Sequence, residues 1–239
     1  MADVLAEATK ENIRFGSHEA GDSSTFRIML LSYLQEKDWA RFGINTLIGL
    51  PADQTVSPRQ ASFLPKYLET VLSNSEIKQN GEYKPLVKTD NIIYEPKEPA
   101  LQESFFLSPR LVFWSLLLIV LLLSVYEYIR KRHFAELDRI LLFLTGLIGL
   151  LIVFMWFFTD HDAVVKNLNI LWAMPLHLIP AFLITKAKAA RFIKVYFGIN
   201  ALVLILFLIL FIFKTHYFDV AALPLALILL LRSAIIYTK

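Results

Sequence analysis

Three long runs without a charged side chain constrain the fold of this chain most strongly. They cover Ile140–Thr159, Asn167–Thr185 and Val195–Phe213, and contain 20, 19 and 19 residues. About 20 apolar helical residues span the roughly 30 Å hydrocarbon core of a bilayer. Two weaker candidates, at about 111–129 and 217–237, flank these runs. The sequence therefore predicts a mainly α fold in which residues 110–239 form a membrane domain of five transmembrane helices.

The two weaker candidates contain charges near their ends. Leu111–Tyr126 is free of charge, and its helix continues past Glu127, which can snorkel at a helix end. The last candidate contains Asp219 and Arg232, each within about a turn and a half of an end. In the whole chain 56% of residues are hydrophobic and 19% are charged, against averages of about half and a quarter in globular proteins. A disordered chain and a single water-soluble core are thereby excluded.

The basic residues predict the orientation of these spans. The loops after spans one and three contain four Lys or Arg each, and the other two loops contain one each. Cytoplasmic loops are enriched in such residues, so the two basic loops and the C-terminus are expected in the cytoplasm and residues 1–108 outside it. Indole rings favour the membrane interface, and three of them fall near the outer interface in this topology. These are Trp114, Trp156 and Trp172.

The polar N-terminal part, residues 1–94, is predicted to be a mostly helical extracytoplasmic segment, joined to the membrane by a linker over residues 95–109. Capping residues and apolar spacing predict its helices, and Gly and Pro predict its turns. The expected elements are an amphipathic helix within Met1–Arg14, helices over Phe26–Leu34, Trp39–Ile48 and Ser57–Val71, a turn at Gly49–Asp53, and candidate strands at Lys84–Val87 and Asn91–Tyr94.

The start of the chain does not read as an export signal. Met1–Arg14 lacks the apolar h-region that a signal peptide needs, yet the predicted topology places residues 1–108 across the membrane. This combination predicts the C-terminal portion of a longer precursor, with a truncated extracytoplasmic segment. The alternative is a complete protein with a cytosolic N-terminus, which would invert the positive-inside pattern of every loop.

Several kinds of chemistry are not expected. The net charge is +3 and the pI is about 9.0, but the basic residues flank apolar spans, so nucleic acid is not a predicted partner. The chain has no cysteine, which excludes disulfides and thiolate nucleophiles within it. No metal-spaced set of ligands and no phosphate-binding motif is present, so we expect no cofactor. His18 and Glu19 lie near Asp22, Ser23 and Ser24, and we interpret this group as solvated loop residues rather than a Ser–His–acid site.

Polar residues at the outer end of span two and within span three form the candidate site. Such groups are costly in a bilayer and commonly face a bundle interior or a functional cavity. They either bind neighbouring helices or form a pocket at the level of lipid headgroups. We expect the first five of the following residues to converge near the outer leaflet, because a short loop joins the two spans. The candidates for substrate binding or docking are Asp160, His161, Asn167, Asn169, Trp172 and His177.

Two groups of motifs resemble a known family. The run Trp156–His177 resembles the signature of the membrane domain in the Lnb-type lipoprotein N-acyltransferases of certain Gram-negative bacteria. Other motifs resemble the latter part of that family's periplasmic domain, and they occur in the same order. They are Thr25-Phe26-Arg27, Trp39, Phe42-Gly43-Ile44, Gly49–Asp53 and Phe63-Leu64-Pro65.

The resemblance implies a function for the complete protein. It implies acyl transfer to the N-terminal amine of a lipidated cysteine in the bacterial inner membrane, with membrane lipids and bacterial lipoproteins as partners. The family uses a His and a Cys, the latter in an Asn-Cys-x-x-Arg motif, and the family's residues just after this Cys resemble Ala2-Asp3-Val4-Leu5. Because this chain has no cysteine and His18 does not match the family's histidine, no catalytic residue is carried over. The alternative function is a non-catalytic membrane anchor or assembly scaffold.

Overall fold

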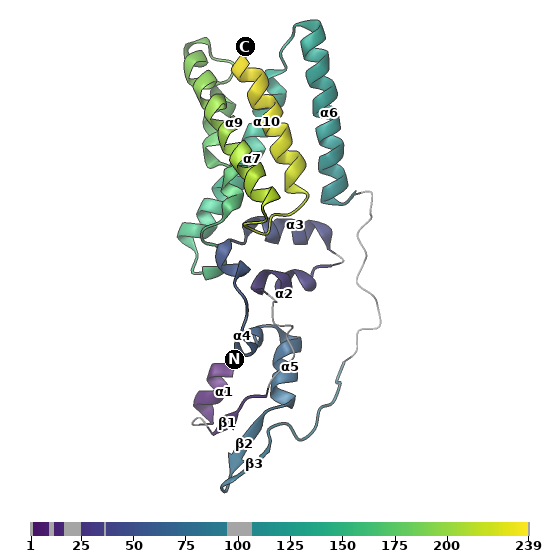
Figure 1. The fold of residues 1–239 in the computed structure, drawn as a ribbon, viewed down its shortest axis with the longest axis vertical. Coiled ribbons are helices and arrows are strands. Elements are labelled where there is room, and N and C mark those ends of the chain that lie inside the picture. The colour runs from purple at the N-terminus through teal and green to yellow at the C-terminus, as the bar shows by residue number, and fades with distance from the viewer. Residues whose placement is uncertain (1, 10–11, 17–24, 36, 95–106, 239) are drawn as a thin grey trace. The chain divides into compact units, whose positions relative to one another are not determined.

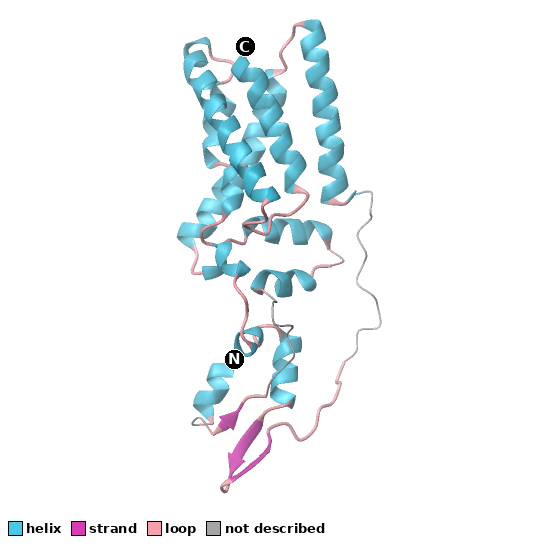
Figure 2. Cartoon of the chain, in the orientation of Figure 1, coloured by secondary structure: helices cyan, strands magenta, loops and turns pink. Residues whose placement is uncertain are grey.

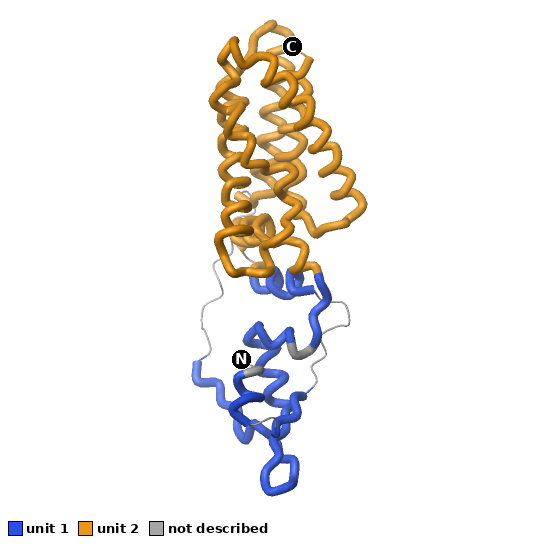
Figure 3. Tube along the Cα trace, turned by 90° about the vertical axis from the view of Figure 1, so that its left-hand side faces the viewer, with its two compact units in different colours: residues 1–33, 54–101 blue, residues 34–53, 102–239 orange. Residues whose placement is uncertain are grey.

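The fold is that of a computed structural model, which describes residues 2–9, 12–16, 25–35, 37–94 and 107–238 (Figure 1). The prediction of a mainly helical chain is confirmed, and a small sheet is added to it (Figure 2). Two compact units are present: unit 1 comprises residues 1–33 and 54–101, and unit 2 comprises residues 34–53 and 102–239 (Figure 3). The group around His18 and residues 95–106 of the linker lie outside the described residues.

Unit 1 contains a three-stranded antiparallel sheet. Its strands, in the order β1-β2-β3, are Ile13–Arg14, Glu76–Gln79 and Glu82–Pro85. Gln79 pairs with Glu82, so two residues connect β2 to β3. These are Asn80 and Gly81, with φ of 53° and 89°, as a tight hairpin turn requires.

The strand predictions were only partly right. The predicted strand Lys84–Val87 overlaps β3 by two residues, and the one at Asn91–Tyr94 is wrong. Ile92 and Ile93 are 83% and 97% exposed, so no packing favours a strand there. The Asn80-Gly81 pair was the sequence signal for the hairpin.

The helices of unit 1 are short. They are α1 (Ala2–Ala8), α2 (Phe26–Ser32), α4 (Pro58–Ala61) and α5 (Pro65–Ser73). Thr25 caps α2, since its Oγ1 accepts from the backbone N–H of Ile28 at 3.2 Å. The helix predicted from Ser57 is divided in two, because Leu64 precedes a proline and is extended, with ψ of 135°.

Unit 2 contains the apolar helices. Among the described residues, three are long and apolar enough to cross a membrane. They are α6 (Pro109–Arg130), α7 (Ala135–Phe158) and α9 (Ala190–Ile212), the last preceded by the 3₁₀ turn η6 (Ala187–Ala189). The helix α10 (Ala222–Thr238) is also apolar, but its 17 residues extend only about 26 Å at 1.5 Å per residue.

The third predicted span is not one continuous transmembrane helix in the structure. Residues 167–185 instead form the 3₁₀ helices η4 (Leu168–Leu171) and η5 (Pro175–His177) and the helix α8 (Leu178–Leu183). Pro175 has no N–H for a helical ladder, and Met174 before it is extended, with ψ of 132°. The bend packs against α7, where a Cβ at Gly149 would lie 2.2 Å from the Ala173 carbonyl oxygen.

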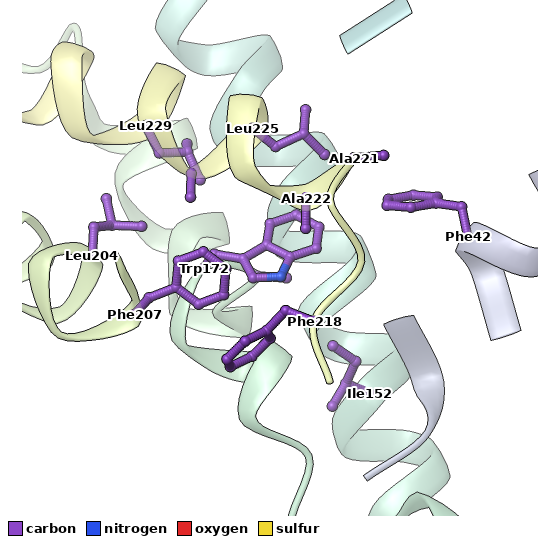
Figure 4. Packing of buried hydrophobic residues seen from close by; sticks show 12 residues of the cluster. Phe42, Ile152, Trp172, Leu204, Phe207, Phe218, Ala221, Ala222, Leu225 and Leu229 are labelled. Carbon is purple, nitrogen blue, oxygen red and sulfur yellow. The ribbon is translucent and has the colours of Figure 1, made fainter. Parts of the chain in front are cut away.

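The largest core cluster of unit 2 surrounds Trp172, which is completely buried. Figure 4 shows its indole among Phe207 of α9, Phe218 and the small residue Ala222 of α10. Phe42 reaches the same cluster from the helix α3 (Asp38–Leu47). The predicted interfacial position of Trp172 therefore does not describe its surroundings, which are the protein core.

The two ends of unit 2 differ. Helix α3 lies across one end, which we call the α3 end, and the C-terminus lies at the other, the C-terminal end (Figure 1). The two basic loops are neighbours, since Arg139 Nη2 donates to Thr185 Oγ1 at 3.2 Å. Both lie at the C-terminal end (Figure 1).

Candidate functional site

Two asparagine side chains cap the C-terminus of α3. The last carbonyls of a helix have no partner within it, and the Thr46 carbonyl is one of these. Asn167 Nδ2 donates to this oxygen at 2.8 Å and Asn169 Nδ2 donates to it at 3.2 Å. Both side chains are 1% exposed. The third predicted span is thus joined by hydrogen bonds to a helix more than a hundred residues earlier.

The same asparagines shape their own segment. Asn167 Oδ1 accepts from the backbone N–H of Asn169 at 2.9 Å and from its Nδ2 at 3.1 Å. The first bond is an Asx-type contact, which competes with regular helix formation. It starts η4 at the position where the sequence predicts a long helix.

A chain of hydrogen bonds extends from these amides into the bundle. Trp172 Nε1 donates to Asn169 Oδ1 at 3.0 Å, and the Trp172 carbonyl lies 3.1 Å from Nε2 of His177. Nδ1 of His177 is 2.6 Å from the hydroxyl of Tyr196 on α9. Four of the six predicted site residues therefore belong to one buried network, which connects α3, the broken third segment and α9.

The loop before α10 makes a second connection to α3. Asp219 Oδ1 accepts from the backbone N–H of Ala221 at 2.9 Å, next to the start of α10, where a carboxylate favours the helix N-terminus. Its Oδ2 accepts from Asn45 Nδ2 at 3.3 Å. Asp219, which the sequence marks only as a charge near the end of a span, thus binds α3.

A close backbone contact forms the third connection. The Gly49 N–H donates to the Ala163 carbonyl at 2.8 Å, just before the 3₁₀ helix η1 (Leu50–Asp53). A Cβ at Gly49 would lie 1.8 Å from the carbonyl oxygen of Val165. Glycine is therefore required for this contact, which involves the loop containing the 3₁₀ helix η3 (Asp162–Val164).

The two remaining predicted site residues lie outside the network. Asp160 and His161 are exposed, and within the described part of the chain no hydrogen bond to their side chains is found. They lie on the loop that comes after α7, close in sequence to the Ala163 carbonyl that binds Gly49. Convergence of the predicted residues is therefore limited to Asn167, Asn169 and Trp172.

We call these three connections between the segment 34–53 and the rest of unit 2 the polar junction at the α3 end. Its asparagine side chains and the Trp172 indole are buried and hydrogen-bonded, and none of them is a nucleophile. Among the residues that the structure describes, no group of three or more metal-ligating side chains is found. The exposed residues 160–163 lie on the loop that contributes the Ala163 carbonyl to this junction.

A second polar cluster, at the C-terminal end, was not predicted from the sequence. Arg232 of α10 donates from Nη1 to Glu127 Oε2 of α6 at 2.5 Å and from Nη2 to Asp138 Oδ2 of α7 at 2.9 Å. These side chains are at most 3% exposed. The backbone N–H of Phe134 also donates to Glu127, and His133 lies 2.8 Å from Asp138. The prediction that Glu127 snorkels is wrong, because its charge is paired inside the bundle.

The three long apolar helices are typical of a helical membrane protein. The family model of the Lnb transmembrane domain matches residues 101–239. Because the match covers more than half of the chain, this protein belongs to the Lnb transmembrane domain family. No curated protein and no solved structure matches the chain. The resemblance is thereby confirmed for the membrane part, and for the motifs within residues 25–65 it stays a prediction.

Proposed function

We propose that this chain is the membrane part of an inner-membrane lipoprotein N-acyltransferase, in which it holds an extracytoplasmic domain at the level of the lipid ester bonds. The family match supports the proposal, and the polar junction at the α3 end is the observation that carries it. Three independent connections join the segment 34–53 to the ends of the membrane helices. A helix that only extends from a linker would not need buried partners of this kind.

The proposed orientation places the α3 end on the periplasmic side. Lys and Arg favour the cytoplasmic side, and both basic loops lie at the C-terminal end (Figure 1). The chain would cross the inner membrane several times, with residues 1–108 in the periplasm. The exposed residues Asp160 and His161 would then face the periplasm or the outer headgroups, where a lipid or a lipoprotein could contact them.

The reaction is acyl transfer from an ester to the N-terminal amine of a lipidated cysteine. A thiolate would attack the ester, and the amine would then resolve the acyl-enzyme. The 239 residues contain no cysteine, so the proposed reaction would take its thiolate from a residue outside them. The chain alone should form no acyl-thioester adduct.

Deletion of the gene that encodes this chain tests the proposal. We expect lipoproteins of the deletion strain to lose the acyl group on their N-terminal amine, as measured by mass spectrometry of N-terminal peptides, and reintroduction of the gene to restore it. Unchanged N-acylation would overturn the proposal. It would favour the alternative, an anchor or scaffold without a role in acylation, which a co-purification of partners would then address.

A further inference from the structure

A buried histidine with an unused ring nitrogen lies at the α3 end, outside the network described above. His216 belongs to the loop between α9 and α10, and its side chain is completely buried. Its Nδ1 lies 2.6 Å from Oδ2 of Asp53 in η1. Its Nε2 is buried and has no hydrogen-bond partner among the described residues. A buried polar atom left in this state costs about 1 to 3 kcal/mol, so it needs a physical explanation.

The carboxylate of Asp53 determines what Nε2 can do. An ionised carboxylate only accepts hydrogen bonds, so Nδ1 of His216 is the donor in this pair. In the neutral ring, Nε2 is then an acceptor. In Ser–His–Asp catalytic triads, a carboxylate holds the histidine that acts as general base in one orientation and one tautomer. The partner that Nε2 of the neutral ring lacks is therefore an O–H or N–H group.

The surroundings of the ring are apolar. The ring of Phe218 packs edge-on against that of His216, with centroids 4.7 Å apart, and Phe207 packs against Phe218 at 4.8 Å. Ile212 and Phe213, which end α9, are 72% and 74% exposed. A molecule with one hydrogen-bond donor and a long apolar chain would match these features.

The buried nitrogen lies close to the surface in sequence and in space. Thr215 and Tyr217, on either side of His216, are exposed, and the side chain of Asp53 is 23% exposed. A headgroup would approach the ring from the side of these exposed residues.

We propose that Nε2 of His216, oriented by Asp53, is a binding site for the hydroxyl or amine group of an amphiphile. The inference deepens the proposed function and rests on it for the source of the ligand. An ester and an amine react to give an amide and an alcohol, so the reaction consumes one such donor and releases the other. The site would hold the reacting amine, the released alcohol, or both.

Binding of simple amphiphiles to the full chain in neutral detergent micelles tests the site without any acyl transfer. The probes are tetradecylamine against tetradecyltrimethylammonium, and tetradecylglycerol against its dimethyl ether, so that each pair differs in donor N–H or O–H groups. The signal is the ¹⁵N chemical shift of Nε2 in protein labelled at histidine, assigned from its loss in His216→Asn. We expect the donor of at least one pair to bind about tenfold more tightly than its methylated analogue. A response to the amine alone identifies the amine as the ligand, and a response to the glycerol ether alone identifies the alcohol. Equal responses within both pairs, or no response, would overturn the inference.

Three variants distinguish the role of Nδ1 of His216 from that of Nε2. His216→Asn retains a donor to Asp53 but has no atom at the level of Nε2. It should no longer bind the donor probe of a pair more tightly than the methylated analogue, as measured by a binding assay that does not use the ¹⁵N signal. His216→Gln places an amide oxygen at that level and should retain part of it. In Asp53→Asn the new amide can donate to Nδ1, which moves the ring proton to Nε2 and should abolish the preference. The control His133→Asn changes a partly exposed histidine at the C-terminal end, away from His216, and should have no effect.

If the His216 variants fail to fold, the affinities of the two probe pairs for the unmodified protein, measured by a binding assay that needs no ¹⁵N assignment, decide the question. The probe-binding result and the N-acylation result of the deletion strain also distinguish failure of this site from failure of the proposed function. Donor-selective binding without any change of N-acylation in the deletion strain would overturn the function only, and loss of N-acylation without donor-selective binding would overturn only this site.

Discussion

Arg232 on α10 and Asp138 on α7 form a two-point contact, in which Nε and Nη2 of the guanidinium donate to Oδ1 and Oδ2 of the carboxylate at 2.5 and 2.9 Å. The same guanidinium binds Glu127 on α6. Three helices are thus joined through one buried cation at the C-terminal end.

Arg232→Met should destabilise the protein strongly, because it leaves two carboxylates buried without their cation. Loss of one partner of a buried ion pair costs about 3 to 5 kcal/mol. Thermal unfolding of the purified protein in detergent should therefore begin at a clearly lower temperature.

The matched control removes all three charges together. Arg232→Met combined with Glu127→Gln and Asp138→Asn should recover much of the lost stability, since no uncompensated charge remains. A triple variant that is less stable than the single variant would contradict this interpretation of the cluster.

Contacts in this cluster are of a kind that local sequence patterns do not predict. The charge-free runs predicted that α6, α7 and α9 exist, because apolar length is a local property, although α7 and α9 each begin five residues before the run. The pairing of Glu127 with Arg232 joins residues 105 positions apart, and no local pattern indicates it. The same holds for the Thr46 carbonyl, whose two amide donors come more than a hundred residues later. The break of the third segment has a local signal in Pro175, because proline has no N–H for the helical ladder.

Gly49→Ala should disturb the junction at the α3 end, because a Cβ there would lie 1.8 Å from the Val165 carbonyl oxygen. The chain has no cysteine, so a disulfide between Asn45→Cys and Asp219→Cys can report the junction. We expect this disulfide to form readily in membranes and its yield to fall when Gly49→Ala is added. Gly43→Ala is the control, since a Cβ there has no neighbour within 4 Å. Equal disulfide yields with Gly49→Ala and with Gly43→Ala would show that the close contact at Gly49 is not required.

The proposed orientation predicts the accessibility of single cysteines to a membrane-impermeant thiol reagent added from the periplasmic side. Lys78→Cys and Asp162→Cys should be labelled, and Lys188→Cys should be labelled only after the membrane is disrupted. Labelling of Lys188→Cys in intact spheroplasts, without labelling of the other two, would invert the topology.

Trp172→Phe should lower stability modestly while leaving the core filled. The phenyl ring replaces most of the apolar contact, but the hydrogen bond to Asn169 Oδ1 is lost and leaves a buried acceptor with fewer donors. We expect a loss of about 1 to 3 kcal/mol, measured by thermal unfolding. Phe207→Leu, in the same cluster, tests packing without a polar change.

The central claim is that lipoprotein N-acylation by this protein requires the junction between the segment 34–53 and the membrane helices. The most direct test compares Asn169→Ala with Asn200→Ala in the deletion strain, by N-acylation of lipoproteins relative to the amount of protein in the membrane. Asn200 is an equally buried asparagine that donates to Ser233 within the bundle at 2.9 Å, so it controls for loss of a buried amide. We predict that Asn169→Ala lowers N-acylation per molecule at least several-fold and that Asn200→Ala leaves it unchanged. Equal values for the two variants, or N-acylation that falls only with protein amount, would contradict the claim and leave the junction as a helix-packing element.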